Sequence, residues 1–209
     1  MAHLRKPLAA AVGLNTVVLV IEGVGGVGAN SLSLLTDAVH NLSDETALVF
    51  LLLAYLSRTG LSGQLLRAAN VLNSVGLLAI SALLVWQAVE RLLHPAPVLT
   101  VVPIIAGLIG AVGNWGVAKA LEEAAHHDAA IRLAYVHNLG DALLSLAPVV
   151  AGALILFTGQ TVFDPLVAVA VAGVIIGSTL HAIAASRREL LWPSRVVCDP
   201  PESPQRSTI

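Results

Sequence analysis

Six long apolar stretches follow one another along the chain, and they restrict it to folds that are stable in lipid. They cover residues 8–29, 32–56, 65–93, 99–121 and 129–157, and the last runs from the Asp164-Pro165 turn to about residue 186. A helix needs about 20 mostly apolar residues to cross the hydrocarbon core of a bilayer. The sequence therefore predicts an all-α membrane protein with six transmembrane helices.

The composition supports a membrane environment and excludes several classes of function. The chain is 56% hydrophobic and 11% charged, whereas an ordinary soluble domain carries about 25% charged residues. No basic face suggests a nucleic-acid partner. Because Cys198 is the only cysteine, the chain cannot form a disulfide framework or a thiolate metal site of its own.

The basic residues predict the orientation in the membrane. With six spans, all but one of the 11 lysines and arginines fall on one side, and such residues gather on the cytoplasmic side. Only Arg91 falls on the other side, so both termini are predicted to be cytoplasmic. Arg5 and Lys6 also resemble the start of a signal peptide, but the apolar run and the spans that follow favour a first membrane helix.

Local signals mark the connections and the end of the chain. Pro95 and Pro97 separate the third stretch from the fourth. Asp164 has the character of an N-cap, and Pro165 that of a first helical residue. Residues 1–191 are predicted to form one transmembrane domain, and residues 192–209 a short polar cytoplasmic tail without fixed structure. The short loops and the preference for arginine over lysine suit a bacterial inner membrane.

Ionisable side chains inside membrane helices are costly and usually functional. In this chain the second stretch contains Asp37, His40, Asp44 and Glu45, the fifth contains His137 and Asp141, and the first contains Glu22, with Asn15 two turns earlier.

Two of these groups repeat one motif. His40 and Asp44 are four residues apart and therefore share a helix face, as do His137 and Asp141. Both pairs lie near the middle of their stretches, hence near the centre of the bilayer. The two helices should run antiparallel, and equivalent ligand pairs on such helices suggest an inverted repeat, a common plan of transporters.

Together the pairs offer two imidazole nitrogens and two carboxylate oxygens, a ligand set that suits tetrahedral zinc. The two aspartates would neutralise a divalent cation, which lowers the cost of placing it in a medium of low dielectric constant. Without metal the two carboxylates repel each other, so protons and metal should compete for the site. Alternatively, each His–Asp pair is only a buried hydrogen bond between helices, but two matched pairs favour the metal site.

Several other residues are candidate accessory groups. Asp37 lies on the face of His40. Glu22 and Asn15 could assist the site, although hydrogen bonds between helices are the favoured interpretation. His126 and His127, in a predicted cytoplasmic loop, could collect metal ions or belong to a solvated loop. Glu45 points to another face and is interpreted as a structural or gating residue, and His94 and His181 are interpreted as structural.

Two segments resemble signatures of the cation diffusion facilitator family. The members of this family are metal/proton exchangers of the zinc-transporter type. Residues 30–44 resemble the second-helix signature, and residues 132–142 resemble the fifth-helix signature. The turns at residues 92–98 and at Asp164-Pro165 are also similar. The resemblance covers about residues 8–190.

The resemblance implies that His40, Asp44, His137 and Asp141 are transport-site ligands. It also implies efflux of cytoplasmic metal in exchange for protons by alternating access, often by a homodimer. Histidine at the first ligand position resembles members that prefer zinc and discriminate against cadmium, although cobalt, cadmium, nickel and iron also fit the ligand types. The expected function is zinc transport, not enzymatic catalysis.

Most family members also carry a cytoplasmic C-terminal domain, whereas here only a short tail follows the sixth stretch. We therefore expect a member without that domain, in which a homodimer forms through membrane helices. Small residues of the third stretch could supply the packing: Ala68, Ala69, Ser74, Gly76, Ala79 and Ser81.

Two rival functions stay open at this point. An intramembrane metal-dependent hydrolase would keep an open coordination position for water and a general base. Here four ligands close the site, and the sequence contains no HExxH motif. A structural membrane protein would use the His–Asp pairs only to hold helices together, and it would bind no metal.

Overall fold

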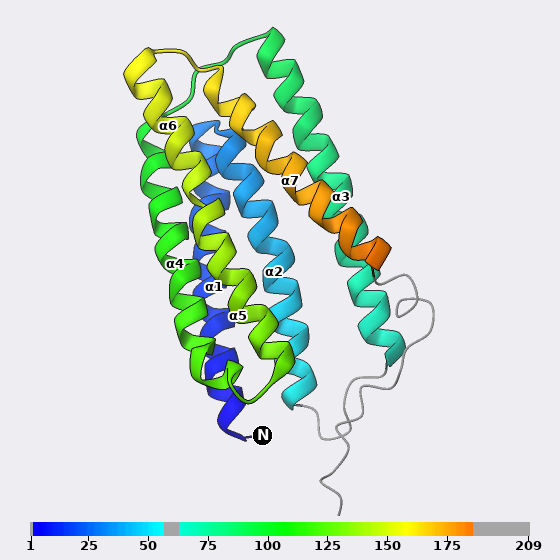
Figure 1. The fold of residues 1–209 in the computed structure, drawn as a ribbon. Helices are drawn as coiled ribbons and strands as arrows, with labels where there is room; N and C mark the ends of the chain where they lie inside the picture. Colours follow the sequence, from blue (N-terminus) through cyan, green and yellow to red (C-terminus); the bar gives the residue numbers. More distant parts are fainter. Residues whose placement is uncertain (1, 57–62, 186–209) are drawn as a thin grey trace, which may run out of the picture.

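The chain folds into a set of long helices (Figure 1). The computed structural model describes residues 2–56 and 63–185, and the regular structure in these ranges is entirely α-helical. In chain order the helices are α1 (Ala2–Ala29), α2 (Leu32–Leu56), α3 (Gly63–Leu93), α4 (Val101–Ala125), α5 (Ala129–Leu144), α6 (Leu146–Thr158) and α7 (Phe163–Ala185). The predicted boundaries agree to within a few residues, except that α1 begins well before residue 8.

Helices α5 and α6 are two halves of the predicted fifth span. They are separated at Ser145, and together they form one apolar segment, Ile131–Thr158. The interruption has a local cause, because Pro148 has no N–H to donate to the carbonyl of Leu144. The described chain thus contains a long helical segment at each of the six predicted positions.

The helices have the composition of membrane spans. In the described part of the chain, five segments are long and apolar enough to cross a bilayer, and α2 is the predicted span that is not among them. Helix α2 is long enough but not apolar enough, because it carries Asp37, His40, Asp44 and Glu45. Large apolar side chains such as Leu72, Trp86 and Phe157 are more than 70% exposed, as lipid contact requires. The all-α membrane fold is confirmed.

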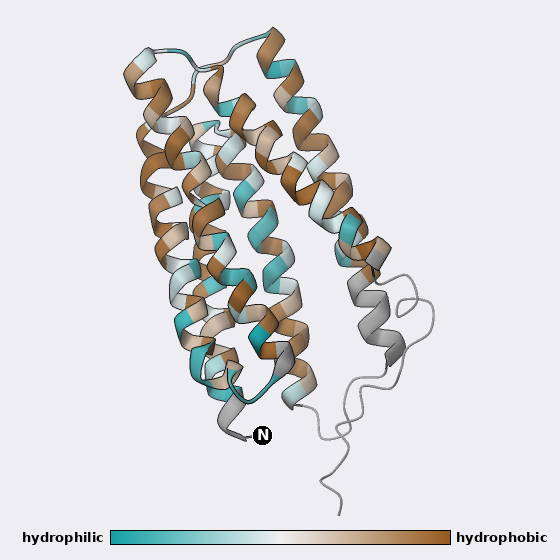
Figure 2. Cartoon of the chain, in the orientation of Figure 1, coloured by the Kyte–Doolittle hydropathy of each residue, from teal (hydrophilic) through white to brown (hydrophobic). Residues whose placement is uncertain are grey.

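The helices form a bundle with a helix pair beside it. Helices α1, α2, α4 and the α5–α6 span make up the bundle, and α3 and α7 lie side by side against α2 (Figure 1). Many of the hydrophilic residues inside the bundle lie along α2 and α5 (Figure 2). The polar face of α2 is therefore enclosed by protein, while the apolar surfaces remain outside.

The bundle has two ends that are useful for orientation. We call the end where α1 begins the Leu8 end, and the end where α1 turns into α2 the Asn30 end (Figure 1). Helix α7 runs from the Asn30 end toward the Leu8 end, as an even number of crossings requires. Which end faces the cytoplasm remains the prediction made from the basic residues.

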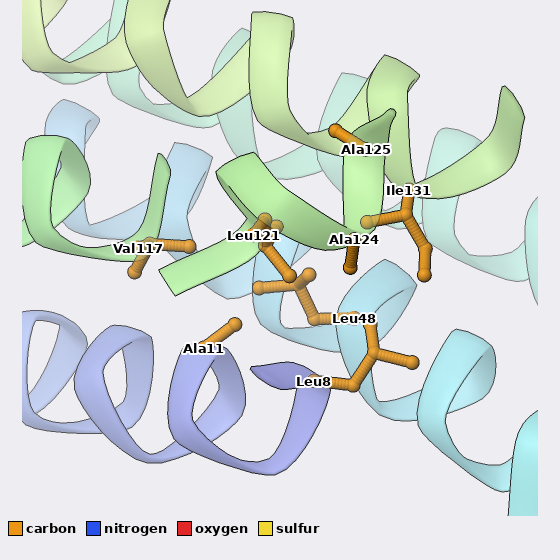
Figure 3. Close-up of a cluster of buried hydrophobic side chains, with 8 residues drawn as sticks. All are labelled: Leu8, Ala11, Leu48, Val117, Leu121, Ala124, Ala125 and Ile131. Atoms are coloured by element: carbon orange, nitrogen blue, oxygen red, sulfur yellow. The ribbon is translucent and has the colours of Figure 1, made fainter. Parts of the chain in front are cut away.

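An apolar cluster packs four helices together at the Leu8 end of the bundle (Figure 3). It joins side chains of α1, α2, α4 and α5, which are buried to at least 94%: Leu8, Ala11, Leu48, Val117, Leu121, Ala124, Ala125 and Ile131. This cluster fixes α1 and α4 against each other below the polar centre of the bundle.

A buried carboxylate organises the Asn30 end, and here one prediction was wrong. Asp164 does not cap its own helix; its side chain instead accepts hydrogen bonds at the start of α2. Oδ2 accepts from the Leu32 amide at 2.7 Å, and Oδ1 accepts from the Ser33 amide at 3.2 Å. The hydroxyls of Ser31 and Ser33 also donate to Oδ1, each at 2.6 Å. Asp164 thereby satisfies free amides at the positive end of α2 and ties α7 to it.

Arg91, the one basic residue predicted on the far side, has a structural role at the same end. Its guanidinium donates to the backbone carbonyl of Asn30 and, at 2.7 Å, to the Asn30 side-chain oxygen. Asn30 has a positive φ of 55°, which asparagine tolerates better than most residues. Arg91 thus holds α3 against the turn between α1 and α2.

Candidate metal centre

Four side chains from α2 and α5 converge in the middle of the bundle. One nitrogen or oxygen from each of His40, Asp44, His137 and Asp141 lies within 4.8 Å of the others. It is the only such group of three or more potential metal ligands among the described residues. The structure therefore brings together the four residues that the spacing predicted.

The contacts between the two helices are crossed. His40 Nε2 donates to Asp141 Oδ1 at 2.9 Å, and His137 Nε2 donates to Asp44 Oδ1 at 2.8 Å. Within the first motif, His40 Nε2 lies 3.7 Å from Asp44 Oδ2. Within the second, His137 Nε2 lies 3.6 Å from Asp141 Oδ2. Antiparallel helices that carry the same His-x-x-x-Asp motif produce this reciprocal pattern.

The cluster is buried on three sides and open on one. The side chains of His40, Asp44 and Asp141 are at most 11% exposed, whereas His137 is 50% exposed. Asp44 Oδ2 and Asp141 Oδ2 are buried and accept no hydrogen bond. Such oxygens are costly in an apolar interior unless a cation binds them.

A cavity of about 440 Å³ leads to the open side. On α2 it is lined by Ser43, Asp44, Ala47, Leu48 and Leu51, and on α5 by Leu133, Ala134, His137 and Asn138. These residues lie between the cluster and the Leu8 end, so the cavity lies on the Leu8 side of the cluster.

The predicted accessory residues of α1 lie beside the cluster and not in it. Asn15 Nδ2 donates to the Asn41 carbonyl and to Glu45 Oε2, both at 3.0 Å. Asn41 Nδ2 donates to Glu22 Oε2 at 2.6 Å. Both Asn15 and Glu22 thus form hydrogen bonds between helices, and Glu45 points toward α1 and away from the four ligands.

Asp37 and the loop histidines are also outside the four-residue cluster. Asp37 is 1% exposed and lies on α2 on the Asn30 side of His40. His126 and His127 are exposed in the α4–α5 connection, and no third ligand joins them among the described residues. Metal capture by this loop, one of its two interpretations, stays a prediction.

Sequence analysis missed two polar residues that support the cluster. Ser145 is fully buried, its amide donates to the Asp141 carbonyl at 2.8 Å, and its hydroxyl accepts from Asn114 Nδ2 at 3.1 Å. Neither residue is ionisable, so neither stood out in an apolar stretch. Asn114 could have been found, because an asparagine in an apolar membrane stretch indicates a hydrogen bond to another helix.

The fold and the cluster define a class: a multi-pass integral membrane protein with a buried set of metal-type ligands between two antiparallel helices. Residues 8–191 match the cation efflux transmembrane domain. The chain therefore belongs to the cation efflux family, which is that of the cation diffusion facilitators. It is a multi-pass protein of the bacterial inner membrane.

Named relatives support this assignment. The chain is 32% identical to the zinc transporter ZitB of Escherichia coli over 208 residues, which cover 94% of the chain and 66% of the relative. It is 33% identical over 170 residues to the cadmium, cobalt and zinc/H(+)-K(+) antiporter of Bacillus subtilis, covering 77% of the chain and 55% of that protein. It is 27% identical over 196 residues to the cation efflux system protein CzcD of an Alcaligenes strain, covering 90% and 62%. The chain thus spans less than two thirds of the length of these relatives.

Proposed function

We propose that this chain exports a divalent metal ion, with zinc the preferred substrate, in exchange for protons. His40, Asp44, His137 and Asp141 bind the ion. The observation that carries the proposal is the crossed cluster itself, in which two imidazoles and two carboxylates from different helices meet at one buried point. The names of the relatives, which include a zinc transporter and a zinc antiporter, agree with it.

The spacing of the ligand atoms supports zinc. Ligand atoms about 2.0–2.1 Å from a tetrahedral ion are about 3.3 Å from one another. The four nitrogen-to-oxygen distances in the cluster, 2.8, 2.9, 3.6 and 3.7 Å, lie on both sides of that value. Small side-chain movements would therefore create a four-coordinate site in which two carboxylates balance the charge of the ion. Cobalt and cadmium, which appear in a relative's name, fit the same ligand types.

The cavity supports a route of entry. With both termini in the cytoplasm, the Leu8 end faces the cytoplasm, and the cavity leads from there to His137. Metal enters by this route and loses water to the four ligands. The helices then rearrange so that the cluster faces the Asn30 end, where protons displace the metal. Imidazole is suited to take up such protons because it titrates near physiological pH.

Two further parts of the proposal concern the organisation of the protein. Residues 1–191 form the transport domain, and residues 192–209 lie outside the described residues. A homodimer would form through lipid-facing helix surfaces, a stoichiometry that native mass spectrometry measures. Ser81, one of the small residues predicted to pack between protomers, is fully buried within the chain and is not available for that contact.

The test is zinc transport by purified protein in proteoliposomes under a proton gradient. His40→Ala and Asp141→Ala should each abolish flux, because each removes a ligand that no neighbour can replace. In calorimetry each variant should bind zinc more than about 100-fold more weakly than the wild type. Loss of a residue that only supports a ligand already weakens metal binding by about 10- to 100-fold. His181→Ala, which removes an exposed imidazole from α7, is the matched control and should transport normally. Normal flux in either ligand variant would exclude this function.

A further inference from the structure

Glu22 of α1 and Asp37 of α2 form a second acidic group that the four-ligand site does not use. Both residues are completely enclosed, with 0% and 1% of their surfaces exposed. Asn41, whose Nδ2 donates to Glu22 Oε2 at 2.6 Å, lies four residues after Asp37 on the same face of α2, so the two carboxyl groups are neighbours. Two carboxyl groups can share a hydrogen bond only if one of them carries a proton.

The surroundings supply few other partners. Asn41 is the one described residue whose side chain donates to Glu22. No other described group donates to Glu22 Oε1 or Asp37 Oδ2, and none of the ion pairs among the described residues includes either carboxyl. Two unpaired negative charges in so apolar a place would repel strongly.

We propose that Glu22 and Asp37 share one proton, and that this pair is a proton-binding site distinct from the four metal ligands which releases its proton when metal binds. The proposal rests on the proposed function, and it identifies a carrier for part of the exchanged protons. In the metal-free state the O–H of one carboxyl donates to the other carboxylate. On release the proton passes to water, and both groups become anionic.

The position of the pair connects it to both ligand helices. Asp37 lies one helical turn from His40, and Asn41, which binds Glu22, directly follows His40. On the other side, Glu22 Oε1 and the Cβ of Ser145 both lie against Gly110 of α4, and Ser145 is one helical turn from Asp141. Outside the pair, His40 of α2 and Asp141 of α5 are the described charged or titratable groups that act on Asp37, and α4 contributes Gly110, which lies against Glu22 Oε1.

The electrostatics favour release on metal binding. A divalent ion brings two positive charges to within about one helical turn, 5–6 Å, of Asp37. At low effective dielectric constant that charge stabilises the doubly ionised pair over the protonated one. The pair also lies on the Asn30 side of the cluster, opposite the cavity, so metal and this proton approach from opposite ends of the bundle.

Infrared difference spectroscopy tests for the proton directly. The wild-type protein should show a protonated-carboxyl stretching band that shifts in D₂O. This band should change in Glu22→Gln and be lost in the double variant Glu22→Gln/Asp37→Asn. Glu45→Gln is the matched control, because Glu45 accepts hydrogen bonds from Asn15 and Thr16 and has no acidic partner among the described residues. An unchanged band in the double variant would overturn the proposal. If the double variant does not fold, the band of Glu22→Gln decides.

Zinc tests the coupling. Addition of zinc should remove the band in the wild-type protein. In calorimetry with two buffers of different ionisation enthalpy, Glu22→Gln should release about one proton fewer per zinc than the wild type. Its zinc affinity should change by less than about 10-fold, because the four ligands are intact. A band that zinc leaves unchanged would overturn the coupling, whereas loss of zinc binding in the wild-type protein would instead contradict the proposed function.

Discussion

At the residue scale, Asp164 shows how one buried carboxylate can determine where two helices meet. It accepts four hydrogen bonds from the start of α2, and two of them come from backbone amides. An asparagine side chain at this position would present an N–H₂ group to donors, which leaves a buried donor unsatisfied. We expect Asp164→Asn to lower the free energy of unfolding by about 1–3 kcal/mol.

Denaturant unfolding in detergent measures this change. Ser178→Ala is the control, because its hydroxyl only bonds the Ile175 carbonyl of its own helix, and it should cost less than about 0.5 kcal/mol. An Asp164→Asn variant as stable as the wild type would show that the cap does not hold the Asn30 end together.

Single residues also show what the sequence could and could not reveal. His40, Asp44, His137 and Asp141 were predictable because a four-residue spacing on a helix is a local property of the sequence. The partners of Asp164 were not predictable, because they lie more than 130 positions away in the chain. The same limit applies to Glu22 and Asp37, whose contact depends on how α1 and α2 rotate against each other.

At the element scale, α4 approaches α1 so closely that only glycine fits at position 110. A Cβ atom there would overlap Glu22 Oε1 and would lie 3.1 Å from its Cδ. Because Glu22 is fully buried, its carboxyl cannot move away without breaking its bond to Asn41. Gly110→Ala should therefore destabilise the protein by about 1–3 kcal/mol and alter the carboxyl band of the Glu22–Asp37 pair.

Gly173→Ala in α7 is the matched comparison for this variant. No atom lies within 4 Å of a Cβ built at Gly173, and alanine favours a helix over glycine by up to about 1 kcal/mol. Its thermal stability in detergent should equal or exceed that of the wild type. Equal stability of the two alanine variants would contradict the close contact between α1 and α4.

The helices themselves were largely predictable, since apolar length determines a span, whereas two of their details were not. The interruption at Ser145 follows from Pro148, a signal that was present in the sequence but was not used. The pairing of α3 with α7 beside the bundle depends on tertiary packing, which the uniform apolarity of these stretches does not encode.

At the scale of the whole molecule, the cavity and the predicted orientation together specify which positions are accessible from each side. Leu51 lines the cavity toward the Leu8 end, and Leu99 is 62% exposed at the Asn30 end. In a Cys198→Ser background, an impermeant thiol reagent should label Leu51→Cys from the cytoplasmic side only. It should label Leu99→Cys from the opposite side only, and the reverse pattern would refute cytoplasmic termini.

Zinc and a proton gradient should then change the labelling in a definite direction. If transport occurs by alternating access, protons supplied at the Asn30 end together with zinc increase the population in which the cluster faces that end. Closure of the cavity lined by α2 and α5 would bury position 51, so its labelling rate should fall several-fold while that of Leu99→Cys does not fall. In the His40→Ala background zinc should have no effect, because the ion cannot discriminate between two states unless it binds one of them better. Equal protection by zinc with and without His40 would mean that the ion acts elsewhere than at the four-residue cluster.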